Sequence, residues 1–169
     1  MRILGIAVSV LLLSSSGWAT REKAKAELQD AQGKRVGTAL LTQEDNGVRI
    51  ELRLNDLPPG VHAIHIHETG ACTAPDFKSA GGHYNPGNMH HGKDNPAGKH
   101  AGDLDNIAVE RDGKAHTVLL DSSVTLGIGP NSLLKTGGTA LVIHEKPDDY
   151  KSDPAGNAGA RIACGVIAQ

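Results

Sequence analysis

Most of the nine histidines of this chain occupy positions where they could bind a metal ion. His65 and His67 lie two residues apart in residues 61–67, an alternating stretch that is typical of a β-strand. Residues two apart on a strand point to the same face, so both imidazoles would aim at one spot. Such a pair could begin a site for copper or zinc. Taken alone, the pair is also compatible with hydrogen-bonded histidines in a core.

The segment after this strand favours the metal interpretation. It carries His83, His91, His100 and Asp103 in Gly-, Pro- and Asn-rich sequence with little periodicity. A long irregular loop inside a compact domain is uncommon unless something organises it, and a metal ion would do so. Nitrogen and carboxylate ligands without thiolates suit zinc, and ligation by histidine alone also suits copper. His144, at the end of a later apolar run, is a further candidate.

The elements that must position these residues are short strands separated by turn signals. We expect eight of them, at residues 25–29, 35–42, 48–54, 61–67, 106–110, 115–120, 140–144 and 161–167. Asp45-Asn46-Gly47 and Asp112-Gly113 predict two hairpin turns. The regular spacing predicts an antiparallel all-β sandwich or barrel. Irregular sequence is concentrated in residues 68–102 and 145–160, which both border histidine-bearing strands.

The beginning of the chain predicts export. Met1-Arg2, an apolar run over residues 3–13 and small residues at Gly17 and Ala19 are typical of a cleavable signal peptide, residues 1–19, cut near Ala19. The apolar run is too short to anchor the protein in a membrane. Residues 20–169 are then expected to form one domain. The charge pattern has no basic patch that would favour nucleic acid.

Two cysteines, Cys72 and Cys164, are the only ones in the chain. In an exported protein such a pair is typical of a disulfide. Two thiolate metal ligands are the alternative, which we disfavour because the histidines already supply a full set.

Five segments of the chain resemble, in order, the signatures of the copper/zinc superoxide dismutase family. They resemble the family patterns G-x-H-G-F-H-x-H-E, G-x-H-[FY]-N-P, H-x-G-D-L, H-E-x-x-D-D and G-N-A-G-x-R-x-A-C-G-V-I, at residues 60–68, 82–86 (the last five positions of the second pattern), 100–104, 144–149 and 156–167. One departure is Ala63, where the family usually has glycine. The resemblance follows the predicted mature chain in order, with the motifs themselves between residues 60 and 167, and the chain looks like the bacterial periplasmic branch.

The resemblance implies a fold and a set of metal ligands. The fold would be an eight-stranded antiparallel Greek-key β-barrel with two long functional loops, and each subunit would hold one copper and one zinc ion. The implied copper ligands are His65, His67, His83 and His144, and the implied zinc ligands are His83, His91, His100 and Asp103. His83 would therefore bridge the two metals.

The resemblance also implies roles for residues that are not ligands. Asp148 would accept hydrogen bonds from His65 and His91, an arrangement that fixes ring orientation. Cys72 would pair with Cys164, and Arg161 would lie over the copper.

The implied activity is the dismutation of superoxide to O2 and hydrogen peroxide in the periplasm. Copper would cycle between two oxidation states, zinc would hold and tune the site, and Arg161 and His83 would be the catalytic residues. A non-catalytic copper and zinc carrier or buffer with the same fold is the alternative. A zinc hydrolase is disfavoured, because four zinc ligands leave no open position for water.

The second loop, the oligomeric state and two further histidines are less strongly constrained by the sequence. The stretch from His144 to Arg161 is shorter than in eukaryotic relatives, and the sequence does not tell whether Lys146 and Lys151 face the substrate channel. Monomer and homodimer are both compatible with the sequence. His62 alternates out of phase with His65 and is expected to pack, while His91 is preferred to His90 as a ligand.

Overall fold

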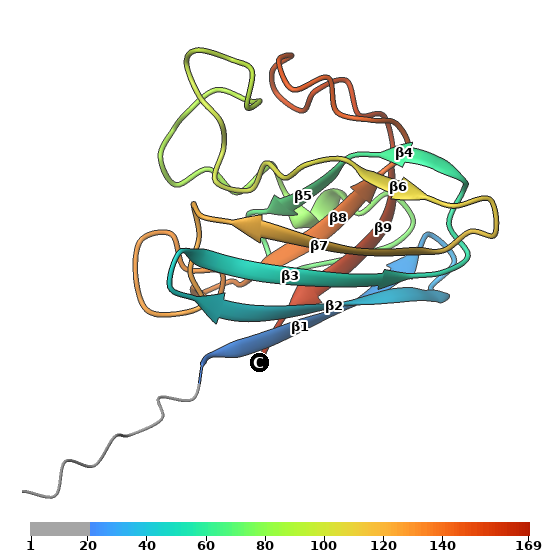
Figure 1. The fold of residues 1–169 in the computed structure, drawn as a ribbon, viewed down its shortest axis with the longest axis horizontal. Coiled ribbons are helices and arrows are strands. Elements are labelled where there is room, and N and C mark those ends of the chain that lie inside the picture. The colour runs from blue at the N-terminus through green and yellow to red at the C-terminus, as the bar shows by residue number, and fades with distance from the viewer. Residues whose placement is uncertain (1–20) are drawn as a thin grey trace, which may run out of the picture.

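The structure is a computed structural model that describes residues 21–169, so the predicted signal peptide and cleavage site lie outside the described residues. Figure 1 shows a curled sheet with long loops at one end. The strands are β1 (Lys23–Asp30), β2 (Arg35–Glu44), β3 (Gly47–Leu54), β4 (Gly60–His62), β5 (Ile64–His67), β6 (Ile107–Val109), β7 (Ala115–Asp121), β8 (Thr139–His144) and β9 (Arg161–Ile167), with one 3-10 turn, η1 (Lys78–Ala80). Within residues 21–169 no helix is both long and apolar enough to span a membrane.

Seven of the described strands form one antiparallel sheet in the order β5-β8-β9-β1-β2-β3-β7. β4 and β6 form a separate pair. In Figure 1 the large sheet curls so that this pair lies near its edge strand β7, while β4 runs on into the other edge strand, β5. The arrangement confirms the predicted antiparallel all-β fold.

Local sequence explains the first hairpins. In β1 the buried side chains of Ala24, Ala26 and Leu28 alternate with exposed polar ones, which is the period of a half-buried strand. Glu44 pairs with Gly47 across the predicted Asp45-Asn46-Gly47 turn, as expected. The second predicted turn also forms, since Glu110 N–H donates to Lys114 O at 2.8 Å. The strands on either side of it, β6 and β7, then join different sheets.

All eight predicted runs are strands, and residues 61–67 change sheet along the run. β4 pairs with β6 and β5 pairs with β8, with the change at Ala63. The Ala63 N–H donates to Lys146 O, and the Ala63 carbonyl accepts from His144 N–H, both at 2.9 Å. A strand that switches sheets in this way makes the corner of a barrel. The switch separates His62 from the ladder that carries His65 and His67.

The core is aliphatic, as the shortage of aromatic residues requires. Valine, leucine, isoleucine and alanine side chains make up most of the main buried cluster. Phe77 lies in a smaller cluster with Ala80, Ala140, Val142 and Cys164, next to the loop that follows β5. This packing makes the sheet a rigid base for the loops at its end.

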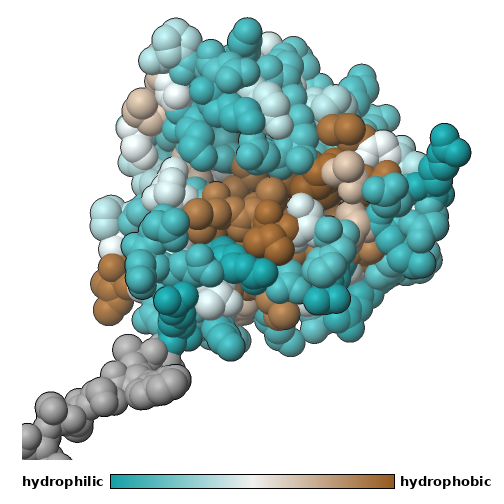
Figure 2. Space-filling view, in the orientation of Figure 1, coloured by the Kyte–Doolittle hydropathy of each residue, from teal (hydrophilic) through white to brown (hydrophobic). Residues whose placement is uncertain are grey.

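Two long loops meet at one end of the sheet. The first runs from β5 to β6 and the second from β8 to β9, and Figure 1 shows them side by side above the strands. A third irregular segment, residues 122–138, was not singled out from the sequence. Figure 2 shows a largely polar surface over the loops and an apolar patch below them, where Val118 and Leu120 of β7 are about half exposed.

Candidate metal centre

Strands β5 and β8 bring three histidines together at this end of the sheet. His65 and His67 come from β5 and His144 ends β8, and His83 from the first loop completes the group. One nitrogen from each of these four buried side chains lies within 4.8 Å of every other. As the sequence predicted, His65 and His67 share one face of the strand, and both imidazoles point to the same place.

A second group lies beside the first and shares His83 with it. It contains His83, His91, His100 and Asp103, again with ligand atoms within 4.8 Å of one another. The Asp103 Oδ1 lies 2.8 Å from His83 Nδ1, 3.1 Å from His91 Nδ1 and 3.3 Å from His100 Nδ1. The Asp103 Oδ2 accepts the N–H groups of Gly92 and His100, both at 2.9 Å. One carboxylate thus gathers three imidazoles and the loop that carries them.

Asp148 connects the two groups from the second loop. Its Oδ2 lies 2.8 Å from His65 Nε2, and its Oδ1 lies 2.9 Å from His91 Nε2. The same Oδ1 accepts the Tyr150 N–H at 2.6 Å. The side chain of Asn106 fixes the Asp148 backbone, donating to its carbonyl at 3.0 Å and accepting its N–H at 2.8 Å. This contact with His65 and His91 is the one that the resemblance implied.

Ring nitrogens without a hydrogen-bond partner indicate whether these groups are suited to bind metal ions. Among the described residues, His65 Nδ1, His83 Nε2 and His144 Nδ1 are buried without a hydrogen-bond partner. Buried polar atoms are nearly always paired, because an unpaired one costs free energy. In His65 and His83 the other ring nitrogen is held by a carboxylate, and in His67 Nδ1 is 3.0 Å from Gly81 O. His65 and His67 therefore each keep one nitrogen for a single metal ion. His83 offers one nitrogen to each group, because Asp103, which faces its Nδ1, belongs to the second group. The residues fit the implied metals.

The electrostatics of the first group favour neutral imidazoles, the form that binds metal. Burial, with His83 nearby, lowers the pKa of His67 to about 2. Burial and the neighbouring His65 lower the pKa of His144 to about 3. Burial also lowers the pKa of His83 to about 4, although its hydrogen bond to Asp103 acts in the opposite direction.

Carboxylates dominate the second group. Burial would lower the pKa of His91, but its bonds to Asp103 and Asp148 outweigh that and raise the pKa to about 9. Burial would raise the pKa of Asp103, yet the bonds from His100, His83 and His91 hold it well below its usual range. The Asp148 carboxyl behaves in the same way, its pKa lowered by His65 and His91 against the effect of burial. The two carboxylates therefore stay ionised beside the histidines.

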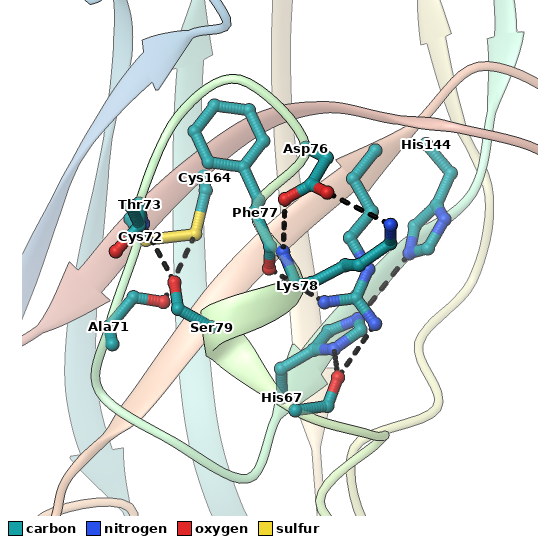
Figure 3. The surroundings of a disulfide bond; sticks show 12 residues. His67, Ala71, Cys72, Thr73, Asp76, Phe77, Lys78, Ser79, His144 and Cys164 are labelled. Atoms are coloured by element: carbon teal, nitrogen blue, oxygen red, sulfur yellow. Dashed lines mark hydrogen bonds and ion pairs between the residues drawn. A yellow bond between two sulfur atoms is a disulfide. The ribbon is translucent and has the colours of Figure 1, made fainter.

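Arg161, the first residue of β9, is held by the loop that follows β5. Its Nη1 donates to Phe77 O at 2.7 Å and its Nη2 to Gly81 O at 2.6 Å. The disulfide between Cys72 and Cys164, with Cα atoms 5.6 Å apart, ties this loop to β9, and Figure 3 shows the bond next to the segment that carries Phe77. The disulfide that the sequence favoured is present, and it fixes the acceptors of Arg161.

A cavity of about 470 Å³ leads to the first group. Arg161 and Glu68 line it together with His67, His83 and His144, and Pro154, Ala155 and Gly159 form the side contributed by the second loop. Neither Lys146 nor Lys151 is in this lining, so among the described residues Arg161 is its only arginine or lysine. The sequence alone left this point open.

The other histidines lie outside both groups. His62 is buried and its two ring nitrogens lie 2.8 Å from His144 O and Pro58 O, so it packs as expected. His90 is largely exposed and its Nδ1 pairs with Asp153 Oδ2 at 2.7 Å. The sequence analysis missed Asn106 and Asp153, since neither stands in a motif whose chemistry points to a metal site.

A curled antiparallel sheet with two adjoining histidine-rich groups defines a class of β-barrel metalloprotein. The model of the copper/zinc superoxide dismutase (SODC) family matches residues 35–167. Cu-Zn superoxide dismutase 2 of Aquifex aeolicus is 51% identical over 168 residues, 98% of each protein. A SOD-like protein from Bacillus subtilis is 42% identical with a TM-score of 0.82, over 84% of this chain and 96% of that one. Cu/Zn superoxide dismutase from Brucella abortus is 30% identical with a TM-score of 0.71, over 86% and 99%.

The chain therefore belongs to the copper/zinc superoxide dismutase family. Copper and zinc, one of each per subunit, are the cofactors of that family.

Proposed function

We propose that this protein is a superoxide dismutase that uses copper and zinc. The observation that carries the proposal is the pair of buried four-residue groups that share His83 and leave ring nitrogens without partners. Copper would be held by His65, His67, His83 and His144, and zinc by His83, His91, His100 and Asp103. When bound, copper supplies one-electron exchange with superoxide, and zinc supplies a fixed positive charge without redox chemistry.

Arg161 would bind the substrate anion. Its guanidinium is partly buried, fixed by two backbone carbonyls and placed in the lining of the cavity. A cation in the lining of a cavity attracts a small anion and then donates hydrogen bonds to it. Because neither lysine of the second loop lines this cavity, we assign the attraction of substrate close to the site to Arg161.

His83 would hold the proton that the peroxide product needs. Its Nδ1 faces Asp103 at 2.8 Å, so its Nε2 is the atom that would hold copper; whenever copper is not bound there, the same atom would take up a proton from solvent and pass it to the product. Asp103 and the second group keep the ring in place during that exchange.

We also propose the setting in which the protein works. Residues 1–19 would direct export and be removed near Ala19, leaving residues 20–169 as one domain in the periplasm without a membrane anchor. The disulfide supports an oxidising compartment, because such bonds are rare where thiols are kept reduced.

A copper and zinc carrier is the second candidate function. The similarity to a protein described only as SOD-like keeps it in view. Against it stand the complete ligand sets and Arg161, since a carrier needs no anion-binding cation over the metal.

The test compares the mature protein, loaded with copper and zinc, with its His144→Ala variant. We expect cyanide-sensitive superoxide dismutation by the wild type and its loss in the variant, with zinc still bound. A wild-type protein that binds both metals but does not accelerate dismutation would overturn the proposal and favour the carrier.

A further inference from the structure

Asp153 of the second loop reaches a residue of the zinc group. Its Oδ1 accepts the backbone N–H of His91 at 2.6 Å, and its Oδ2 lies 2.7 Å from His90 Nδ1. Asp153 is separated from both histidines by more than sixty residues of sequence, and its own side chain is 44% exposed. We propose that Asp153 is a positioning residue for the zinc ligand His91, an inference that rests on the proposed zinc site.

Three carboxylates hold His91, each at a different atom. Asp103 lies at Nδ1 and Asp148 at Nε2, so both contact the ring. Asp153 alone holds the main chain, through the N–H group. Hydrogen bonds to an ionised carboxylate are short and stronger than neutral ones. The ring contacts set the orientation of the imidazole, and the Asp153 contact sets the position of the backbone that carries it.

The surroundings show why this backbone needs an external partner. The main chain turns sharply at Gly92, which has a φ of 98° and no room for a side chain because it packs against Tyr150 O. Asp94 N–H donates to the same Tyr150 O at 3.1 Å. The first loop thus rests on the second along residues 91–94, in a stretch without a strand ladder to hold it. Where the two loops meet, Asp153 provides the hydrogen bond to the main chain of the ligand residue His91.

Loss of this contact should loosen zinc while leaving the ligands intact. Removing an outer partner of a metal ligand typically weakens metal binding about 10–100-fold. Because Asp148 still holds the ring of His91, we expect the low end of that range for Asp153→Ala, about tenfold faster zinc release.

The experiment measures zinc release from the copper- and zinc-loaded protein to a chromogenic chelator. Asp153→Ala should release zinc about tenfold faster than wild type, and Asp153→Asn should recover much of the difference because its amide oxygen can still accept the His91 N–H. His90→Ala, which removes only the exposed partner, should behave nearly as wild type. Asp105→Ala is the charge-matched control, because the Asp105 side chain pairs with Lys93 and forms no hydrogen bond or ion pair with a member of the zinc group.

A second measurement follows the His91 amide directly. Hydrogen exchange at His91 should be slow in the wild type and fast in Asp153→Ala, while the amides of β8 and β9 are unchanged. Equal zinc release and equal His91 protection in wild type and Asp153→Ala would overturn the proposal, as would an equal effect of Asp105→Ala. Neither measurement depends on dismutation. Both therefore test the role of Asp153 even if the protein binds zinc but lacks dismutase activity.

Discussion

At the scale of single residues, the centre is built from ligands whose second atoms are already committed. The ring of His65 is held by Asp148 and that of His67 by the carbonyl of Gly81, which leaves the other nitrogen of each for a metal ion. A ligand fixed in this way loses little further freedom when a metal binds. The need to hold these rings in place also restricts which substitutions are tolerated at residues that are not ligands.

Gly156 is such a residue. Its φ is 62°, and a Cβ there would overlap Asp148 Oδ1 and lie 2.7 Å from His91 Nε2. Gly156→Ala should therefore break the contact between Asp148 and His91 and weaken zinc binding about 10–100-fold in chelator competition. Gly137→Ala is the matched control, with a φ of 84° and nothing within 4 Å of the added carbon. Equal zinc affinities of the two variants would show that backbone strain alone matters.

Arg161 gives a prediction about substrate. Arg161→Ala should lower the dismutation rate constant by about tenfold or more, because the cavity loses the cation that attracts the anion. Copper and zinc contents, measured by mass spectrometry, should stay at wild-type levels. Arg161→Lys should recover only part of the rate, since one ammonium cannot copy the two contacts to Phe77 O and Gly81 O. A wild-type rate in Arg161→Ala would remove this residue from the mechanism.

At the scale of elements, the site depends on two loops that the sheet does not hold by itself. Asn106, just before β6, pairs its side-chain amide with the N–H and the carbonyl of Asp148, and its own N–H donates to Tyr150 OH at 2.8 Å. These bonds attach the second loop to the start of β6. They take the place of a strand ladder in a segment that has none.

Removing that attachment should release the second loop. Asn106→Ala leaves the Asp148 N–H and carbonyl without partners, which costs about 1–3 kcal/mol for a buried group. We expect a loss of this order in the free energy of unfolding of the metal-free protein, measured with denaturant, and faster hydrogen exchange at Asp148. Asn55→Ala should change neither quantity, because this exposed side chain hydrogen-bonds only Asp56 among residues 21–169. A similar loss in both variants would contradict the role of Asn106.

At the scale of the whole molecule, one covalent bond joins the first loop to the last strand. The Cys72–Cys164 disulfide closes a loop with a sequence separation of 92 residues and holds the segment from which Phe77 and Gly81 accept the bonds of Arg161. Stability and anion binding are therefore coupled through the same connection.

The paired Cys72→Ser and Cys164→Ser substitutions should lower the free energy of unfolding by roughly 4–5 kcal/mol on the chain-entropy model. Denaturant unfolding of the metal-free protein measures this without the contribution of bound ions. The loaded variant should also lose activity while it is still folded, because the acceptors of Arg161 become mobile. Full activity of the folded variant would show that Arg161 does not need the disulfide in order to act.

The sequence by itself determined the strands and the residue types of the centre. The strand runs follow from alternation and turn residues, which act between neighbours in the chain, and His65 and His67 share a face because a strand has a period of two. The choice of His91 over His90 rested on motif spacing, and the structure places His91 in the second group and His90 outside it.

Only the tertiary structure decided how those residues meet. The change of sheet at Ala63, the contact of Asp153 with His91 and the absence of Lys146 and Lys151 from the cavity are set by packing between distant segments. The contact from Asp153 to His91 spans 62 residues, and no local pattern encodes such a pairing. The second loop is placed by hydrogen bonds to other loops rather than by hydrophobic periodicity, and the sequence carries no periodic signal for bonds of that kind.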